Sequence, residues 1–271
     1  MQNIDYKGFK YSKYHGAGND FVMINAIKSP VTLSDDVVKE ICDRRTGVGA
    51  DGLIMVLPSE HYDFRMKYYN CDGHESTFCG NGGRCIAAFA VEEGLCSQNI
   101  EYEAIDGIHK AVVTKNSDNE FMVSVTMRDI DSYDLNEERL LINTGSPHYV
   151  TRVENLKTFD VRKHGAEIRN DKSISTNGVN VDFMQIIDNQ YNIRTFERGV
   201  EDETLACGTG VTASAIAASL WYGGDDIDIR TTLATLNVKF KKSGNSIKDI
   251  VLTGPATHVF DGFYIFANDV H

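Results

Sequence analysis

The chain has 271 residues, of which 42% are apolar, so it can fill the core of one large domain or of two ordinary ones. Its formal net charge of −12 and isoelectric point near 5.1 argue against nucleic-acid binding, because a phosphate backbone attracts basic surfaces. A small-molecule substrate remains compatible with this charge.

The lack of a secretory signal, together with the cysteine content, predicts a protein of a reducing compartment. The first twenty residues lack the apolar segment of a secretory signal. Residues 205–224 are uncharged and rich in small residues, but they are too polar and too often interrupted by glycine for a membrane span, which favours a buried helix. Without an export signal, the six cysteines are expected to be free thiols of a cytoplasmic protein: Cys42, Cys71, Cys79, Cys85, Cys96 and Cys207.

The first half begins with a short amphipathic helix and continues with a strand, a loop and a second helix. Ser34 can cap the first helix, whose apolar stripe falls within residues 37–42. Residues 64–70 alternate between apolar and polar side chains, as a half-buried strand does. The segment Cys79-Gly-Asn-Gly-Gly then leads into a helix over residues 84–91, which Gly94 closes.

The rest of the chain consists mainly of predicted strands. Alternation predicts strands within residues 112–127, 179–187 and 238–252, with polar turns inside the first and last of these ranges. Pro255 is expected to break the chain before a final strand over residues 257–267.

The second half repeats the plan of the first. Residues 191–197 alternate, and Cys207-Gly-Thr-Gly precedes a helix over residues 211–222 that contains no charged side chain. Asn70 and Arg198 each stand nine residues before their cysteine. Helices that are apolar all round must be enclosed. The sequence therefore predicts an α+β fold of two pseudo-symmetric domains, each a curved mixed or antiparallel sheet wrapped around a central buried helix. The expected domains are residues 1–132 and 133–257.

The repeated cysteines suggest acid–base chemistry. The first turn of a helix leaves N–H groups unpaired and carries about half a positive charge, so it can hold a carboxylate and favour a thiolate. Two such elements, facing one another, could move a proton from one face of an α-carbon to the other without metal or cofactor. Buried structural cysteines are the alternative, but the matched glycines favour function.

Two other motifs are weaker. Cys71, Cys79, Cys85 and His74 lie close in sequence, but they lack the paired spacing of a structural zinc site. Residues 47–52 fit Gly-x-Gly-x-x-Gly, but they follow a polar stretch and precede no apolar helix, which argues against dinucleotide binding.

Eight motifs in order resemble the diaminopimelate epimerase family along nearly the whole chain: Tyr14-His-Gly-Ala-Gly-Asn-Asp-Phe21, Gly47-Val-Gly-Ala-Asp-Gly-Leu53, Tyr69-Asn-Cys-Asp-Gly73, Cys79-Gly-Asn-Gly82, Gly145-Ser-Pro-His148, Asn180-Val-Asp-Phe183, Phe196-Glu-Arg-Gly199 and Thr204-Leu-Ala-Cys-Gly-Thr-Gly210. The resemblance implies interconversion of LL- and meso-diaminopimelate in lysine and cell-wall precursor biosynthesis, with no cofactor or metal. It also implies a homodimer, and a final strand over residues 258–271 that joins the first domain.

The resemblance also assigns residues. Cys79 and Cys207 match the catalytic pair. His148 and Glu197 match residues that tune the thiols. The backbone amides that receive the reacting carboxylate match Gly80, Asn81, Gly208 and Thr209, and the remaining substrate-binding positions match Asn19, Asn70, Asn180, Glu197 and Arg198.

Two positions depart from a common form of the pattern. Ser146 stands where many relatives have Asn, and Gly52 replaces a frequent Gln, so details of substrate recognition stay open. The alternatives are a proline or hydroxyproline racemase, an isomerase of the phenazine-biosynthesis type and a non-catalytic amino-acid sensor. Which sulfur is deprotonated at rest also stays open.

Overall fold

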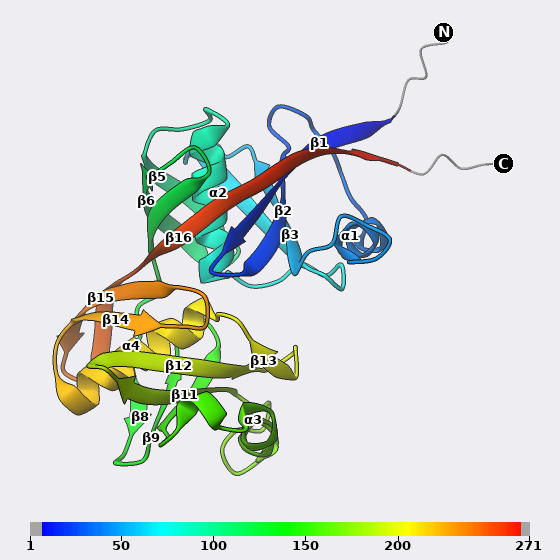
Figure 1. The fold of residues 1–271 in the computed structure, drawn as a ribbon. Coiled ribbons are helices and arrows are strands. Elements are labelled where there is room, and N and C mark those ends of the chain that lie inside the picture. The colour runs from blue at the N-terminus through cyan, green and yellow to red at the C-terminus, as the bar shows by residue number, and fades with distance from the viewer. Residues whose placement is uncertain (1–6, 267–271) are drawn as a thin grey trace, which may run out of the picture.

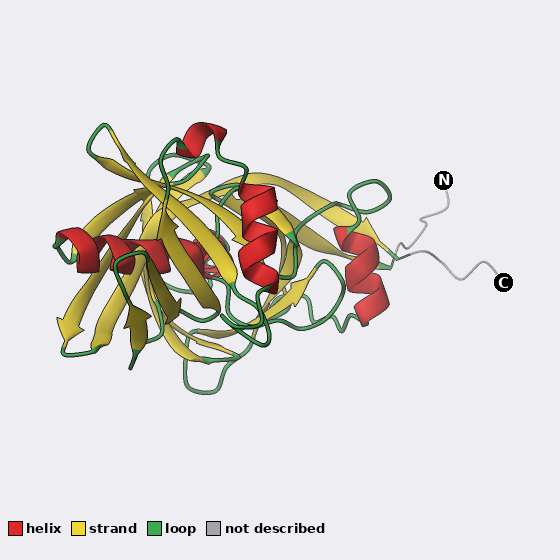
Figure 2. Ribbon diagram, turned by 90° about the horizontal axis from the view of Figure 1, so that it is seen from below, coloured by secondary structure: helices red, strands yellow, loops and turns green. Residues whose placement is uncertain are grey.

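A computed structural model describes residues 7–266 and shows a molecule built mainly of strands (Figures 1 and 2). The helices are α1 (Asp35–Cys42), α2 (Gly80–Glu92), α3 (Val161–Asn170), α4 (Gly208–Tyr222) and the short 3-10 helix η1 (Leu156–Thr158). The strands of the first half are β1 (Gly8–Gly16), β2 (Asn19–Asn25), β3 (Gly52–Leu57), β4 (Phe64–Asn70), β5 (Asn99–Ala104), β6 (Gly107–Lys115) and β7 (Glu120–Thr126). The remaining strands are β8 (Tyr133–Leu135), β9 (Arg139–Asn143), β10 (Pro147–Arg152), β11 (Asn180–Ile187), β12 (Gln190–Glu197), β13 (Asp202–Thr204), β14 (Asp226–Arg230), β15 (Thr235–Ser243) and β16 (Ser246–Ile265).

All sixteen strands between residues 7 and 266 belong to one sheet that β16 divides into two halves. On one side the order is β1 to β7 and then β16. Because β1 also pairs with β16, these strands close into a barrel. On the other side the order is β16-β15-β14-β12-β11-β10-β9-β8, with β13 added to β12. In Figure 1 the first half lies above the second, and β16 runs through both.

Each half encloses one helix that crosses between two parallel strands. β4 and β5 are parallel with α2 between them in the chain, and β12 and β14 are parallel with α4 between them. Parallel neighbours require such a crossover. Residues 80–90 of α2 and 208–219 of α4 are buried. The predicted α+β fold with two enclosed helices is confirmed. None of the helices in the described part is long and apolar enough to cross a membrane.

The prediction that Pro255 breaks the chain was wrong, because β16 runs unbroken for 20 residues. Pairing with β15 ends at Thr253, and pairing with β1 begins at Thr257. Pro255 therefore lies in the short interval where one edge of β16 has no strand partner, so its missing N–H breaks no ladder there. The last part of the predicted final strand, residue 267, lies outside the described residues.

The two buried helices begin earlier than the sequence indicated. The glycine-rich segments after Cys79 and Cys207 form the first turn of α2 and α4 and are not loops. Glycine is tolerated there because close packing requires it. A Cβ at Gly83, for example, would lie 2.5 Å from the Phe78 ring.

We keep residues 1–132 and 133–257 as the proposed domains, with the end of β16 returning to the first. β8 begins at Tyr133, and residues 257–265 of β16 pair with β1, which supports this division. The outer faces carry separate small cores. α1 packs beside β3, and α3 packs on β11 and β12.

Leu252 should be the most sensitive position of β16. Its side chain is fully buried and lies against the starts of both α2 and α4, near Gly80 and Gly208. We expect Leu252→Ala to lower the free energy of unfolding by about 2–5 kcal/mol, because it leaves a cavity. The matched change Leu233→Ala, at a side chain that is 58% exposed, should cost less than about 0.5 kcal/mol. Urea unfolding measures both. Equal losses would contradict the central role of Leu252.

Candidate active site at two facing helix N-termini

Cys79 and Cys207 occupy equivalent positions in the two halves. Each is the residue immediately before its helix, with nearly the same extended backbone: φ −115° and ψ 120° at Cys79, φ −114° and ψ 114° at Cys207. The first intrahelical bonds also match, since Gly83 N–H donates to Cys79 O and Val211 N–H donates to Cys207 O. The sequence repeat is thus a structural repeat around the two thiols.

The N-termini of α2 and α4 meet directly. A Cβ placed on Gly208 would come within 3.3 Å of Gly80 Cα and 3.4 Å of the Asn81 nitrogen. The Asn81 side chain donates to Ala206 O across the interface at 3.1 Å. Two glycines allow this approach, which a side chain would block. The structure therefore brings together Cys79, Gly80 and Asn81 with Cys207, Gly208 and Thr209.

Cys79 lies against Asn19, whose amide orientation is fixed. Asn19 Nδ2 donates to Asp51 Oδ2 at 2.8 Å, which leaves Asn19 Oδ1 to face Cys79 Sγ at 3.6 Å and Asn81 Nδ2 at 3.3 Å. Burial raises the pKa of the Cys79 thiol, and so does the carboxylate of Glu197. The N–H groups of Gly82 and Asn81 and the cation of Arg84 oppose this rise.

Asp51 belongs to a charged network behind Asn19. Arg44 donates to both Asp20 and Asp51 at 2.7 Å, and Lys13 pairs with Asp20 at 2.6 Å. Although burial opposes it, hydrogen bonds from Arg44 and Lys13 hold the pKa of Asp20 well below its usual range. The network fixes the loop that carries Asn19.

Cys207 lies at the end of a hydrogen-bonded cluster. Its Sγ is 3.2 Å from Thr209 Oγ1, which is 2.9 Å from His148 Nε2. His148 Nδ1 pairs with Asp182 Oδ2 at 2.7 Å, and both side chains are fully buried. Burial raises the pKa of Cys207 well above the usual value, and the carboxylates of Glu197 and Asp182 raise it further. Thr209 and the Gly210 N–H oppose them.

Glu197 acts on both thiols, since its charge raises the pKa of Cys79 and of Cys207. Burial raises the pKa of Glu197 itself. The carboxylate, both sulfurs and the two helix N-termini therefore form one site between the halves.

The expected substrate-binding residues do not all lie in one cluster. Asn180 is buried in this cluster: its Nδ2 donates to Ser146 Oγ at 2.9 Å, and its Oδ1 accepts from the Arg198 N–H at 2.8 Å. Ser146, the departure noted in the sequence, also lies 3.0 Å from Thr209 Oγ1. Asn70 ends β4, opposite Gly52 of β3, just before the loop that leads to Cys79.

Sequence reasoning missed Arg84 as part of the site. It is fully buried, and its guanidinium donates to Gly80 O at 3.2 Å and to Asn81 Oδ1 at 2.8 Å. Burial lowers its pKa, but a guanidinium keeps its proton in proteins. The signal was available, because Arg84 is the only charged residue in the first three turns of α2. Asp182 and Asp51 were also missed.

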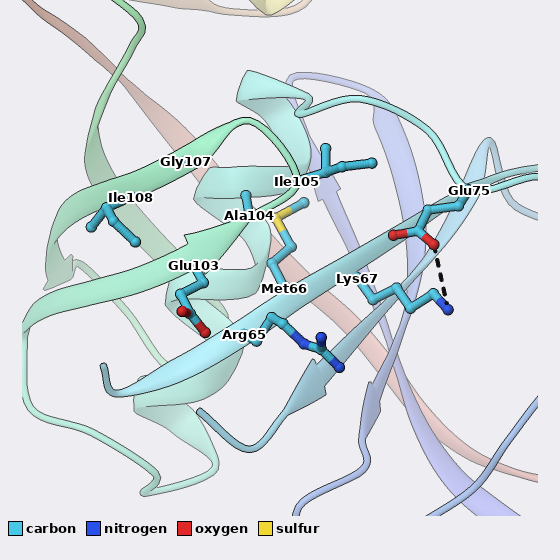
Figure 3. Close-up of a pocket in the computed structure, with 9 residues that line it drawn as sticks. All are labelled: Arg65, Met66, Lys67, Glu75, Glu103, Ala104, Ile105, Gly107 and Ile108. Atoms are coloured by element: carbon cyan, nitrogen blue, oxygen red, sulfur yellow. Dashed lines mark ion pairs between the residues drawn. The ribbon is translucent and has the colours of Figure 1, made fainter. Parts of the chain in front are cut away.

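A hollow of about 550 Å³ lies on the first half, and neither thiol lines it (Figure 3). Arg65, Lys67 and Glu75 line its charged side, with Glu75 3.4 Å from Lys67. A smaller hollow continues from it to Phe78. Neither includes a cysteine. Of the two thiols, Cys207 is only 7% exposed, whereas Cys79 is half-buried.

The site can bind an anion and exchange a proton. The first-turn N–H groups of α2 and α4 converge from opposite halves and suit a carboxylate. The two thiols flank this position as potential acid and base.

The protein shares its fold with solved proteins of different activities. It is similar to a hydroxyproline epimerase of Agrobacterium vitis (TM-score 0.72, 15% identity, 98% of this chain and 94% of that one) and to a PhzF-family phenazine biosynthesis protein of Bacillus anthracis (TM-score 0.73, 16% identity, 96% and 100%). At such identities the likeness shows the fold alone.

Sequence comparisons identify the family. The model for diaminopimelate epimerase matches residues 11–129 and 140–259. Proteins named diaminopimelate epimerase from Flavobacterium psychrophilum and Chlorobaculum tepidum are 41% and 39% identical to it, over 93% and 91% of this chain and 98% of each relative. The chain belongs to the diaminopimelate epimerase family, as its motifs indicated.

Glu197 should make stability depend on pH. Because its folded pKa is raised, its contribution to stability is fully present below the unfolded pKa and is lost as the pH rises through the folded pKa. We therefore expect Glu197→Gln to be more stable than the parent at pH 8, with an advantage that shrinks towards pH 4. Urea midpoints across this range test it. The exposed control Glu154→Gln should show no such trend, and a constant difference for Glu197→Gln would contradict the assignment.

Proposed function

We propose that the protein is a cofactor-independent amino-acid epimerase that interconverts LL- and meso-2,6-diaminopimelate by proton exchange between Cys79 and Cys207. The observation that carries the proposal is the meeting of two cysteine-capped helix N-termini at Gly80 and Gly208. Membership of the family supplies the substrate class.

The reaction moves one proton on and one proton off the same carbon. The substrate carboxylate lies between the helices and accepts hydrogen bonds from the backbone N–H groups of Gly80, Asn81, Gly208 and Thr209. One sulfur, as thiolate, takes the α-proton, so the C–H bond breaks and its electron pair spreads into the carboxylate. The opposite thiol then donates its proton to the other face, which inverts the centre. Preorganised donors aimed at developing charge contribute about 10²–10³-fold each.

The second amino-acid group of the substrate distinguishes this reaction from that of a proline-type racemase. We assign it to Arg198, with its forked guanidinium for a carboxylate, and to Asn19, Asn70 and Asn180, whose amides fix orientation. Arg198 and Asn180 are already joined through the Arg198 N–H, which supports a common role. Separation of the halves admits the substrate, and closure excludes water from the carbanion.

The proposed setting follows from the same family assignment. The reaction belongs to lysine and cell-wall precursor biosynthesis and takes place in the cytoplasm, where all six cysteines, which are free here, stay reduced. We propose no cofactor, no nucleic-acid partner and no membrane association.

Solvent deuterium tests the function directly. The reduced protein, incubated with LL-diaminopimelate in deuterium oxide, should form the meso isomer with deuterium at the inverted centre. Cys79→Ala and Cys207→Ala should each lower turnover by about 10²–10⁴-fold, the usual contribution of general acid–base catalysis. Cys71→Ala, at an exposed thiol, is the control and should retain activity. Substrate bound without deuterium uptake would instead support a sensor, and inversion of proline in preference would support the racemase.

We further propose a homodimer, which the family implies. Residues 259–265 of β16 support it, because they expose several apolar side chains on one strand: Val259, Phe260, Phe263 and Ile265 are 45–51% exposed. Of these, Val259, Phe263 and Ile265 share one face of the strand, since side chains alternate along it, and exposed apolar side chains on one face are typical of an interaction site. Sedimentation equilibrium should give twice the chain mass of 30.1 kDa. Phe263→Glu should give the single-chain mass, and a single-chain mass for the parent would contradict the dimer.

A further inference from the structure

An unbroken chain of polar atoms runs from Cys207 to a buried carboxylate. Cys207 Sγ contacts Thr209 Oγ1 at 3.2 Å, Thr209 Oγ1 contacts His148 Nε2 at 2.9 Å, and His148 Nδ1 contacts Asp182 Oδ2 at 2.7 Å. The last pair has no exposure to solvent. Family resemblance assigned a tuning role to His148 but none to Asp182.

Hydrogen bonding and close packing fix the position of the Asp182 carboxylate. Its second oxygen, Oδ1, accepts from the Thr195 hydroxyl at 2.7 Å. It also reaches closely under the start of α4, since a Cβ on Gly210 would lie 2.4 Å from Oδ1. The glycine in the second copy of the motif therefore makes room for this carboxylate.

The surrounding hydrogen bonds fix which nitrogen of His148 carries the proton. The Arg198 N–H donates to Asn180 Oδ1, so the amide nitrogen of Asn180 points the other way, towards His148 Nε2 at 3.2 Å. The same amide nitrogen donates to Ser146 Oγ at 2.9 Å and to Pro147 O at 3.3 Å, so the Asp182 contact is what assigns the proton. The Asp182 carboxylate only accepts, so His148 carries a proton on Nδ1 and donates it to Asp182, which leaves Nε2 to face the Thr209 hydroxyl.

We propose that Asp182 is a positioning residue that makes His148 the proton acceptor for Cys207, through the hydroxyl of Thr209. The inference rests on the proposed function, in which Cys207 must lose and regain a proton in each catalytic cycle.

The proton transfer balances within these side chains. The Cys207 thiol gives its proton to Thr209 Oγ1 as the Thr209 hydroxyl gives its own to His148 Nε2. The products are a thiolate that accepts from the Thr209 hydroxyl and an imidazolium that donates to both Thr209 and Asp182. The Asp182 carboxylate remains ionised and stabilises the imidazolium, so no outside proton carrier is needed.

The charges around the cluster explain why an acceptor is needed. The titratable groups that face His148 are Asp182 on β11, Glu197 on β12 and Cys207 before α4, while Ser146, Asn180 and Thr209 are neutral. A lone thiolate at Cys207 would face two carboxylates in a dry site. Formed together with an imidazolium, it adds no net charge.

Cys79 has a different charged neighbour from Cys207, so its reactivity is an internal reference for that of Cys207. Arg84, five residues after Cys79, supplies a permanent cation, whereas the equivalent position after Cys207 is Thr212, whose hydroxyl bonds the Gly208 carbonyl. Asp182 should therefore control Cys207 and leave Cys79 unchanged.

A plain electrostatic role for Asp182 predicts the opposite sign. Its negative charge disfavours a thiolate at Cys207, so removal of that charge alone would make Cys207 more reactive. Loss of the relay makes Cys207 less reactive. One substitution, Asp182→Asn, separates the two.

The experiment uses alkylation by iodoacetamide, in which the thiolate forms an S–C bond and iodide leaves. The reduced full-length protein is labelled from pH 5 to 9, and peptide mass spectrometry follows Cys207 and Cys79 in the same molecule. Their rate ratio cancels differences in reagent concentration and in global unfolding between variants. We expect Asp182→Asn to lower the Cys207/Cys79 ratio at pH 7 by about tenfold and to move the Cys207 profile to higher pH. An unchanged or higher ratio would overturn the proposal.

Further variants test the same proton path independently of Asp182. Thr209→Val removes the intermediate hydroxyl and should lower the ratio as Asp182→Asn does, while Thr209→Ser should restore it. If Asp182→Asn does not fold, the Thr209 pair decides, and an unchanged ratio in Thr209→Val overturns the relay. Asp106→Asn is the matched control, because Asp106 pairs with His109 at 3.0 Å outside the thiol site and should leave the ratio unchanged.

Alkylation needs no substrate, so its outcome is independent of the deuterium experiment. A relay without epimerisation would leave the inference standing and refute the function, and epimerisation without the expected shift would do the reverse.

Discussion

The N-termini of α2 and α4 meet head to head at Gly80 and Gly208, and the rest of the architecture serves this contact. Two helix ends that each carry about half a positive charge repel one another in a dry interior. Negative charge placed between them offsets this repulsion. In the proposed reaction the substrate carboxylate supplies that charge. A site of this kind binds anions by construction and needs no metal to do so.

The enclosing strands hold the two helix ends in register. α2 lies inside a closed barrel, α4 lies inside the strands of the second half, and β16 passes through both beneath the junction. Leu252 in the middle of β16 touches the first turn of each helix. The two halves thus share strand β16 next to the site where the two helix N-termini meet. Because β16 belongs to both halves, any separation of the halves must hinge along this strand or the links beside it.

The two thiols sit in matched backbones but in unlike electrostatic surroundings. Arg84 gives Cys79 a fixed cation, while Cys207 has the titratable His148 held by Asp182. The duplicated motif therefore fixes the backbone geometry around the two cysteines, and side chains such as Arg84, His148 and Asp182 set the electrostatic surroundings of their thiols. This division suits a reaction in which the two sulfurs must exchange roles at every turnover.

Much of this was accessible from sequence. The Cys-Gly-x-Gly repeat predicted two equivalent helix starts, and the lack of charge in both helices predicted their enclosure. Asp182 was not predicted, because in the alternating strand Val181-Asp-Phe183 a carboxylate is typical of a solvent-facing position, whereas α4 covers that face here. The continuity of β16 was also missed, since tolerance of Pro255 depends on neighbouring strands that are distant in sequence.

The pairing of β1 with β16 has a consequence for how the protein is made. Ser12 bonds to Asp261, a separation of 249 residues, so the barrel that surrounds α2 lacks its closing strand until residues 257–265 have left the ribosome. At a synthesis rate of about 5–20 residues per second, the first half waits many seconds in an incomplete state with apolar edges exposed. The sheets of both halves are completed by the same late-arriving strand, β16.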